Sequence, residues 1–233
     1  MAIIKTEAVV LKSFNYRDKS RIVSFYTRSN GKLSCVARGV RDTKSKFSGS
    51  LQSMSFVEII FYYKENRTLH NLSSAEFVRS FQNIYSNDEK LSVAFRITDL
   101  LNRTTTENHP SENIFNCFVE SLALLDESDK NFVNIFYKFV LQLSKHLGVE
   151  INANDSLYSD RVGESNGSYF LTSQDAQIIN RLDSWNLKQV TGLFIDNNSA
   201  NRIEKFFENY FRHHLDHVPS SKVDAVLQKV NSA

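Results

Sequence analysis

The spacing of hydrophobic residues changes once along this chain, near Phe77, and this change limits what the chain can fold into. Before Phe77, apolar residues alternate with polar ones, which is typical of β-strands. After it they recur every three or four positions, which is typical of amphipathic helices. We therefore expect an α+β chain of two domains, with a sheet domain over residues 1–80 and a helical domain over residues 81–233.

The first domain contains five strand-like runs separated by turns. They cover residues 7–16, 20–28, 32–38, 53–63 and 68–75, and Asn30-Gly31 is typical of a tight hairpin between the second and the third. Because no helical run interrupts them, we expect a mainly antiparallel sheet. Five short strands in succession favour a small closed barrel or sandwich, with Phe25, Phe56 and Phe61 in its core.

The second domain contains helical runs over residues 88–102, 129–147, 173–185 and 200–215, and a further run that Pro110 and Ser111 open. The run over 129–147 is the clearest, because its phenylalanines follow the i, i+3, i+4, i+7 spacing. Residues 149–172 are rich in Asn, Asp, Ser and Gly, and we expect an irregular insertion there. We expect Pro219 to end the last helix and the final residues to fray or form a helical tail.

Charge is divided unevenly between the two domains. The net charge is only +2, yet residues 1–80 hold 14 Lys and Arg against 6 Asp and Glu, while residues 81–233 hold 14 against 20. A cationic half is typical of a protein that binds nucleic acid or an anionic membrane. The residues that we expect to bind nucleic acid are Lys12, Arg17, Lys19, Arg21, Lys32, Arg38, Arg41, Lys44 and Lys46.

The densest cationic stretch follows the third strand. Arg38, Arg41, Lys44 and Lys46 are opposed only by Asp42, in a segment that also contains two glycines and several small hydroxyl residues. Glycine lets the backbone approach a ligand closely, and hydroxyl groups donate hydrogen bonds to phosphate. The alternative is a solvated surface loop that keeps the protein soluble.

Aromatic residues are interleaved with these cations, as they are in proteins that bind single strands by stacking bases. Tyr16, Tyr62 and Tyr63 are expected to keep an exposed edge, because a phenol hydroxyl needs a hydrogen-bond partner. Phe47 is either a stacking ring or a plug that anchors the loop on the barrel. Tyr16, Phe47, Tyr62 and Tyr63 are therefore the possible base-stacking residues.

The sequence does not argue for catalysis or for a metal site. Cys35 and Cys117 are too few for a disulfide framework or a thiolate zinc site, and we expect both to be buried thiols in a reducing compartment. His213 and His217 have a spacing that can hold a metal. We favour the interpretation that they lie on the helix surface near its C-terminus, where the helix dipole is negative. There is no nucleophile elbow and no dinucleotide fingerprint. We expect no enzyme and no cofactor.

The sequence also bears on localisation. The first residues have too short an apolar run for a signal peptide, and no stretch approaches the roughly 20 apolar residues of a membrane span. We therefore expect a cytoplasmic protein.

Several short motifs resemble the family of the recombination mediator RecO. They are Thr6-Glu7-Ala8-Val9-Val10-Leu11, Asp18-Lys19-Ser20-Arg21-Ile22-Val23, Tyr26-Thr27-Arg28, Gly31-Lys32-Leu33-Ser34, Ala37-Arg38-Gly39-Val40-Arg41 and Lys44-Ser45 leading to Leu51-Gln52. They occur in the order of the family and with nearly its spacing. The resemblance implies a five-stranded, OB-fold-like antiparallel β-barrel followed by an all-helical C-terminal domain.

The resemblance also implies a function in recombinational DNA repair. Members of the family bind single- and double-stranded DNA, anneal complementary strands and help to load the recombinase onto DNA coated by single-strand-binding protein. The implied partners are RecR and the acidic C-terminal tail of single-strand-binding protein, in the bacterial cytoplasm and associated with the nucleoid. Many relatives carry a four-cysteine zinc site after the long Phe-rich helix. Residues 149–172 of this chain contain no cysteine, so we expect no zinc.

An acidic tail that ends in an aromatic residue needs an apolar pocket rimmed by cations. Two groups of cations in the helical domain are candidates, with ordinary solvated side chains as the alternative. They are Lys138 and Lys145 on one run, and Arg202, Lys205 and Arg212 on another. Two other functions remain open at this point, an RNA-binding OB-fold protein and a protein-interaction scaffold whose basic loop meets an acidic partner.

Overall fold

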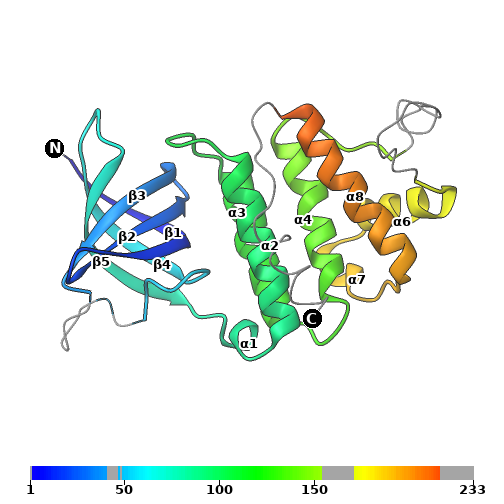
Figure 1. Ribbon diagram of the computed structural model, residues 1–233, viewed down its shortest axis with the longest axis horizontal. Helices are drawn as coiled ribbons and strands as arrows, with labels where there is room; N and C mark the ends of the chain where they lie inside the picture. The colour runs from blue at the N-terminus through cyan, green and yellow to red at the C-terminus, as the bar shows by residue number, and fades with distance from the viewer. Residues whose placement is uncertain (1, 41–46, 48, 154–170, 216–233) are drawn as a thin grey trace. The chain divides into compact units, whose positions relative to one another are not determined.

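The computed structural model describes residues 2–40, 47, 49–153 and 171–215. The chain divides into two compact units, Met1–Asp126 and Glu127–Ala233, and each is described by itself. Unit 1 begins with five strands, which confirms the expected sheet followed by helices. They are β1 (Ala2–Tyr16), β2 (Ser20–Thr27), β3 (Gly31–Arg38), β4 (Phe56–Tyr63) and β5 (Leu69–Arg79) (Figure 1).

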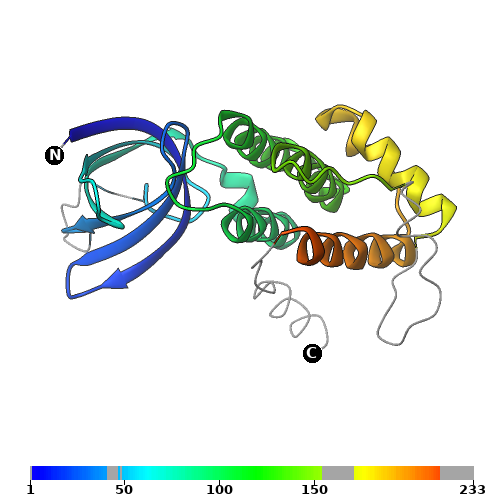
Figure 2. The ribbon, with the colours of Figure 1, turned by 90° about the horizontal axis from the view of Figure 1, so that it is seen from above.

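The five strands close on themselves in the order β1-β2-β3-β5-β4, because β1 pairs with β2 on one side and with β4 on the other. They curve around a common interior in both views of the ribbon (Figure 1, Figure 2). The sheet is mainly antiparallel, as expected. The exception is the short pairing of β3 with β5, which is parallel and joins Ser34 to Leu69 and Val36 to Asn71.

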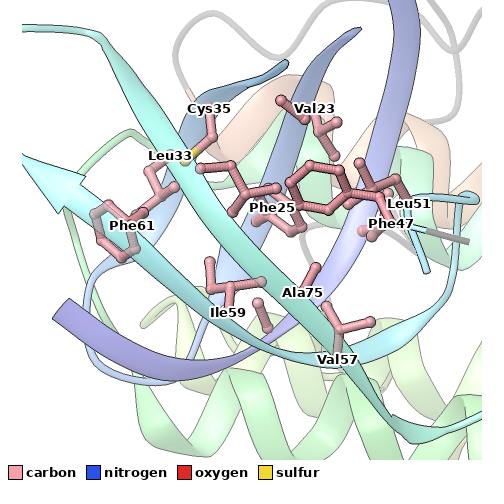
Figure 3. Close-up of a cluster of buried hydrophobic side chains, with 14 residues drawn as sticks. Val23, Phe25, Leu33, Cys35, Phe47, Leu51, Val57, Ile59, Phe61 and Ala75 are labelled. Atoms are coloured by element: carbon pink, nitrogen blue, oxygen red, sulfur yellow. The ribbon is translucent and has the colours of Figure 1, made fainter. Parts of the chain in front are cut away.

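The interior of the sheet is filled by apolar side chains from all five strands (Figure 3). Phe25 and Phe61 are fully buried there, as expected from their places in the strands. Phe47 and Leu51, from the segment between β3 and β4, also lie in this cluster. Phe56 is buried too, but its ring packs edge-on against Phe115 at a centroid distance of 6.0 Å.

Three helices complete the described part of unit 1. They are α1 (Gln82–Tyr85), α2 (Asp88–Thr104) and α3 (Glu112–Glu127). The face of α3 that carries Cys117, Phe118 and Leu122 is buried, as its spacing predicts. The spacing within α2 predicts one buried stripe of Leu91, Ala94, Phe95 and Thr98. Ala94 and Thr98 are buried as this predicts, but Phe95 is 40% exposed, and the buried face extends to Val93, Ile97, Leu100 and Leu101.

Unit 2 is helical where the structure describes it. Its helices are α4 (Phe132–His146), α6 (Ser173–Ser184), α7 (Leu187–Val190) and α8 (Asn197–His214). The apolar stripe of α4 is buried as predicted, and Asn134 on the same helix donates to the carbonyls of Val190 and Leu193 at 2.8 and 2.7 Å. These bonds fix α7 and the following loop to α4.

Two predicted features lie outside the described residues. Most of the irregular insertion expected over 149–172 falls in residues 154–170, and the expected tail falls in residues 216–233. Among the described helices, none combines the length and the apolar character that crossing a membrane requires.

Candidate nucleic-acid interface

A β-bulge in β1 decides which side chains of this strand face outward. Val10 points into the core, and Leu11 is an extra residue that shifts the register with β2. On β2, Val23 is a core residue, so its neighbour Ile22 points outward. Phe14 lies directly opposite Ile22. The bulge therefore turns Phe14 away from the core, where simple alternation from Val10 would have pointed it inward.

Residues on the outward side of β1, β2 and β3 form three cross-strand rows. A hydrogen bond of 3.0 Å between the hydroxyls of Ser24 and Ser34 joins side chains on this side directly. The middle row is apolar, and each of the two flanking rows has one cation at one of its ends. We call these nine residues the open face: Lys12, Ser24 and Ser34; Phe14, Ile22 and Val36; Tyr16, Ser20 and Arg38.

Helices of unit 1 cover the rest of the same side of the sheet. The ring of Tyr26 stacks on Phe115 of α3, with centroids 6.5 Å apart, and the guanidinium of Arg28 lies 4.5 Å from the centre of the same ring. Arg28 also donates to Glu112 at 3.0 Å and to Asn116 at 2.7 Å. These contacts involve Tyr26 and Arg28 and none of the nine residues of the open face. Lys12, Phe14 and Arg38 are exposed there, whereas Ile22 is half-buried and Val36 is buried.

Four of the predicted nucleic-acid-binding residues lie on or beside the open face. Lys12 and Arg38 are exposed members of its outer rows. Arg17 and Lys19 are exposed in the turn that follows Tyr16. Arg17 takes a left-handed φ of 54°, and its guanidinium lies 5.2 Å from the centre of the Tyr16 ring. These four cations surround one strip of surface, which suits a linear polyanion.

Arg21 is not one of these four cations, because its side chain is on the other side of β2. It is at the start of β2, on the same side of the strand as Val23, and its Nε donates to Asn15 Oδ1 at 3.4 Å. Arg21 and Asn15 line an open groove of about 830 Å³ that Gln52 also lines. Phe14 borders this groove as well, so the groove and the open face meet at this ring.

The structure corrects the expectation for Lys32. Its Nζ donates to the carbonyls of Asn102 at 2.8 Å and Thr105 at 2.6 Å, at the C-terminal end of α2. Burial lowers the pKa of the Lys32 ammonium; the charge of Glu107 opposes this shift and that of Lys12 adds to it. A lysine committed to helix carbonyls fastens β3 to α2 and is not placed to bind phosphate.

Three other predicted positions lie outside the described residues. Arg41, Lys44 and Lys46 belong to residues 41–46, so their predicted role stays a prediction.

The predicted stacking residues are not brought together. Tyr16 is half-buried at the edge of the open face, whereas β4 pairs Tyr62 and Tyr63 with Ile3 and Ala2, at the opposite end of β1. Tyr63 packs against the core and lies 4.9 Å, between ring centroids, from buried His70.

The structure also decides between the two alternatives for Phe47. Its side chain is 2% exposed and belongs to the core cluster (Figure 3). Phe47 is therefore a plug and not an exposed stacking ring. Phe14 is absent from the predicted stacking set, although it is 52% exposed on the open face. Its position between Lys12 and Arg17 was the available signal, but only the bulge reveals which way the ring points.

The cations predicted to rim a partner pocket have different surroundings in unit 2. The expectation for Lys138 is corrected, because it is 6% exposed and its Nζ donates to the Asp183 carbonyl at 2.6 Å. Lys145 is exposed and pairs with Asp183 at 2.8 Å and with Glu150 at 3.4 Å. The hydrogen bonds and charges of these two carboxylates raise the pKa of Lys145, with that of Asp183 first.

On α8, Arg202 is half-buried and is committed to a carboxylate of another helix. Its guanidinium donates to both carboxylate oxygens of buried Asp175, at 2.6 and 2.9 Å, and so joins α8 to α6. Arg212 is exposed and pairs with Glu208 one turn away, at 2.8 Å. Lys205 is exposed as well. Of the two groups, Lys145, Lys205 and Arg212 are exposed, Arg202 is half-buried and Lys138 is buried.

The described residues include no cluster of three metal-ligating side chains. Cys35 and Cys117 are buried thiols, as expected, and burial raises the pKa of Cys35 to about 12. His213 is exposed near the end of α8, next to His214, whose ring stacks on Tyr210 at a centroid distance of 4.0 Å. His217 lies outside the described residues.

Two family models match the chain. The model described as "Recombination protein O N terminal" matches residues 1–81, and the model described as "Recombination protein O C terminal" matches residues 86–222. Together they span both the sheet and the helices.

Curated proteins named DNA repair protein RecO are similar over the same regions. The protein of Salinibacter ruber is 35% identical over 148 residues, which cover 64% of this chain and 57% of that protein. The proteins of Chloroherpeton thalassium and Phocaeicola vulgatus are 26% and 28% identical, and each match covers 98% of this chain and 99% of the relative. This chain therefore belongs to the RecO family of DNA repair proteins.

Proposed function

We propose that this protein binds single- and double-stranded DNA on the open face, anneals complementary strands and assists recombinase loading in recombinational repair. One observation carries the proposal: exposed Lys12, Arg17 and Arg38 surround a strip of sheet that the helices of unit 1 leave uncovered. Exposed cations along one strip suit the regular charge of a DNA backbone. Membership of a DNA repair family points to the same ligand.

The strand order supports an OB fold for residues 1–80. A five-stranded sheet that closes in the order β1-β2-β3-β5-β4, with a parallel contact between β3 and β5, fits that architecture. OB folds bind oligonucleotides on the face of their second and third strands and on adjoining loops. The open face occupies the corresponding strands here, and Arg17 and Lys19 lie in the adjoining β1–β2 turn.

Annealing follows from charge neutralisation. Two complementary strands repel each other through their phosphates, and cations that contact the backbone release condensed counterions and reduce that repulsion. Phosphate contacts do not depend on base sequence, so strands of any sequence could be brought together. The protein would act by binding alone and would need no catalytic group.

The helical residues 81–233 would dock protein partners. RecR and the acidic C-terminal tail of single-strand-binding protein are the partners we propose, and the bacterial cytoplasm, in association with the nucleoid, is the proposed location. Of the two predicted groups of cations, Lys145, Lys205 and Arg212 are exposed and could contact an acidic tail. Since Lys145 and Arg212 already pair with carboxylates, an acidic tail would have to compete with Asp183 and Glu208.

An annealing assay tests the proposal. Complementary oligonucleotides with a donor and an acceptor dye are mixed with the wild type, with the triple variant Lys12→Ala, Arg17→Ala and Arg38→Ala, or with the control Lys130→Ala, Arg181→Ala and Lys188→Ala. The control removes the same charge from exposed positions of unit 2. We expect the first variant to anneal about tenfold more slowly and the control to match the wild type. A wild type that does not accelerate annealing, or an equal loss of annealing rate in both variants, contradicts the proposal. In a competition between matched DNA and RNA oligonucleotides, a preference for RNA would instead indicate an RNA-binding protein.

A further inference from the structure

Phe14 is unusual among the aromatic residues of the sheet because it is exposed where its strand would otherwise bury it. Val10 points into the core, and a strand without a bulge would place Phe14 on the same side. The extra residue Leu11 reverses the alternation, so that Ser13 lies opposite core residue Val23 and Phe14 is 52% exposed. Bulges commonly re-aim a side chain at a functional site.

The surroundings of Phe14 are suited to an unpaired base. In the middle row of the open face, half-buried Ile22 is opposite Phe14 and buried Val36 is opposite Ile22, so this apolar step is exposed mainly at Phe14. Lys12 and Arg38 lie in the rows on either side of this step. A flat ring between cations offers a base its π-face and offers the flanking phosphates their counter-charge.

A base pair within a duplex cannot use this ring. Its two faces are occupied by the neighbouring base pairs, so only its edges and the phosphates are available to a protein. Cations alone would bind single and double strands through phosphates. A ring that stacks on a base adds affinity for single strands only.

We infer that Phe14 is a base-stacking residue through which the open face distinguishes unpaired bases from duplex DNA. The inference rests on the proposed DNA binding and adds to it the residue that contacts the base. Asn15 and Gln52 line the groove that Phe14 borders. A base stacked on Phe14 would have its edge in this groove, where the amide groups of Asn15 and Gln52 also lie.

Three ligands of equal length separate stacking from phosphate contacts: a thymidine oligonucleotide, its abasic counterpart and a duplex. Fluorescence anisotropy gives the Kd of each for the wild type, for Phe14→Ala and for the control Phe194→Ala, which removes an aromatic ring that is 81% exposed in unit 2. We expect Phe14→Ala to weaken binding of the thymidine strand about tenfold and to leave the other two ligands unchanged. The control should match the wild type for all three.

A second variant reports on contact directly. The chain has one tryptophan, Trp185, so Phe14→Trp combined with Trp185→Phe places a single fluorophore on the open face. Stacking should quench its emission with the thymidine strand and not with the abasic strand. Equal quenching by both, or a Phe14→Ala variant that binds the thymidine strand like the wild type, overturns the inference and leaves the proposed DNA binding intact. A wild type that binds none of the three ligands contradicts the proposed function itself.

Discussion

His70 shows how a single buried group makes the stability of the barrel depend on pH. It is 4% exposed on β5, its ring lies 5.6 Å from that of Phe61 and 4.9 Å from that of Tyr63, and its Nδ1 has no hydrogen-bond partner among the described residues. Burial lowers the pKa of His70, and the charge of Glu107 only partly offsets this. The folded protein therefore favours the neutral imidazole.

We predict that the stability contributed by buried, neutral His70 is complete above pH 6.5, the ordinary pKa of histidine. This stability is lost as the pH falls below that value. The unfolded chain takes up the proton more readily than the folded one in that range, so the free energy of unfolding decreases. Urea unfolding from about pH 8 to about pH 5 measures it, with His70→Phe as the reference that lacks the group. A constant difference between the two proteins across this range would contradict the prediction.

The burial of Phe47 in the core leads to a second prediction about a single residue. Truncating a buried phenylalanine to alanine leaves a cavity and typically costs about 3–5 kcal/mol. We expect Phe47→Ala to lower the free energy of unfolding by about this amount, whereas Phe14→Ala, which truncates an exposed ring, should change it by no more than about 0.5 kcal/mol. If Phe47→Ala were as stable as Phe14→Ala, Phe47 would not be part of the core.

Between elements, the contact of Arg202 on α8 with Asp175 on α6 shows how a cation predicted to contact a partner serves to join two helices. Asp175 is fully buried and also accepts a bond from the Thr172 backbone N–H at 2.8 Å, which completes the capping box of α6. Burial opposes ionisation of Asp175, but the hydrogen bonds from Arg202 and Thr172 outweigh it and lower the pKa to about 2.

We predict that removing Arg202 destabilises the protein more than neutralising Asp175 does. Arg202→Gln leaves a buried carboxylate without its counter-charge, while Asp175→Asn removes the charge itself. The stability that Asp175 contributes is present above pH 3.8, its ordinary pKa, and is lost as the pH falls towards about 2. Thermal melting of the three proteins over this range should show their Tm values converge at low pH; an Arg202→Gln variant as stable as the wild type near neutral pH would contradict the account.

The elements differ in how far the sequence could predict them. Local alternation locates all five strands, but β1 begins at Ala2 and not at residue 7, because its first residues are defined by pairing with β4. Alternation identifies a strand without naming its neighbour, so the parallel contact of β3 with β5 was not predictable. The single turns α1 and α7 are too short to show a helical period.

The same limit applies to the candidate interface. Arg38 could be predicted, because polar positions of a half-buried strand face solvent. Lys12 could be predicted from its charge, but its direction depends on the bulge, because simple alternation from Val10 points it inward. Lys32 could not, because its partners are carbonyls of Asn102 and Thr105, far along the chain. Phe14 depends on one extra residue in β1, and a bulge leaves no clear local signal.

Across the whole chain, the segregation of charge gives the protein two different surfaces. The cationic excess lies in residues 1–80 and the acidic excess in residues 81–233. If the protein binds DNA as proposed, like charges should discourage binding to the acidic half. DNA affinity should therefore reside in the cations of the open face and not in the net charge of the protein.

The dependence of DNA affinity on salt tests this central claim most directly. Each phosphate contact on a single strand contributes a slope of about 0.7 to log Kd against log salt concentration, so replacing Lys12, Arg17 and Arg38 by alanine should reduce the slope by about 2. The charge-matched control Lys130→Ala, Arg181→Ala and Lys188→Ala should keep the wild-type slope. A smaller slope in the first variant alone is the predicted result, and equal slopes in all three folded proteins would contradict the account.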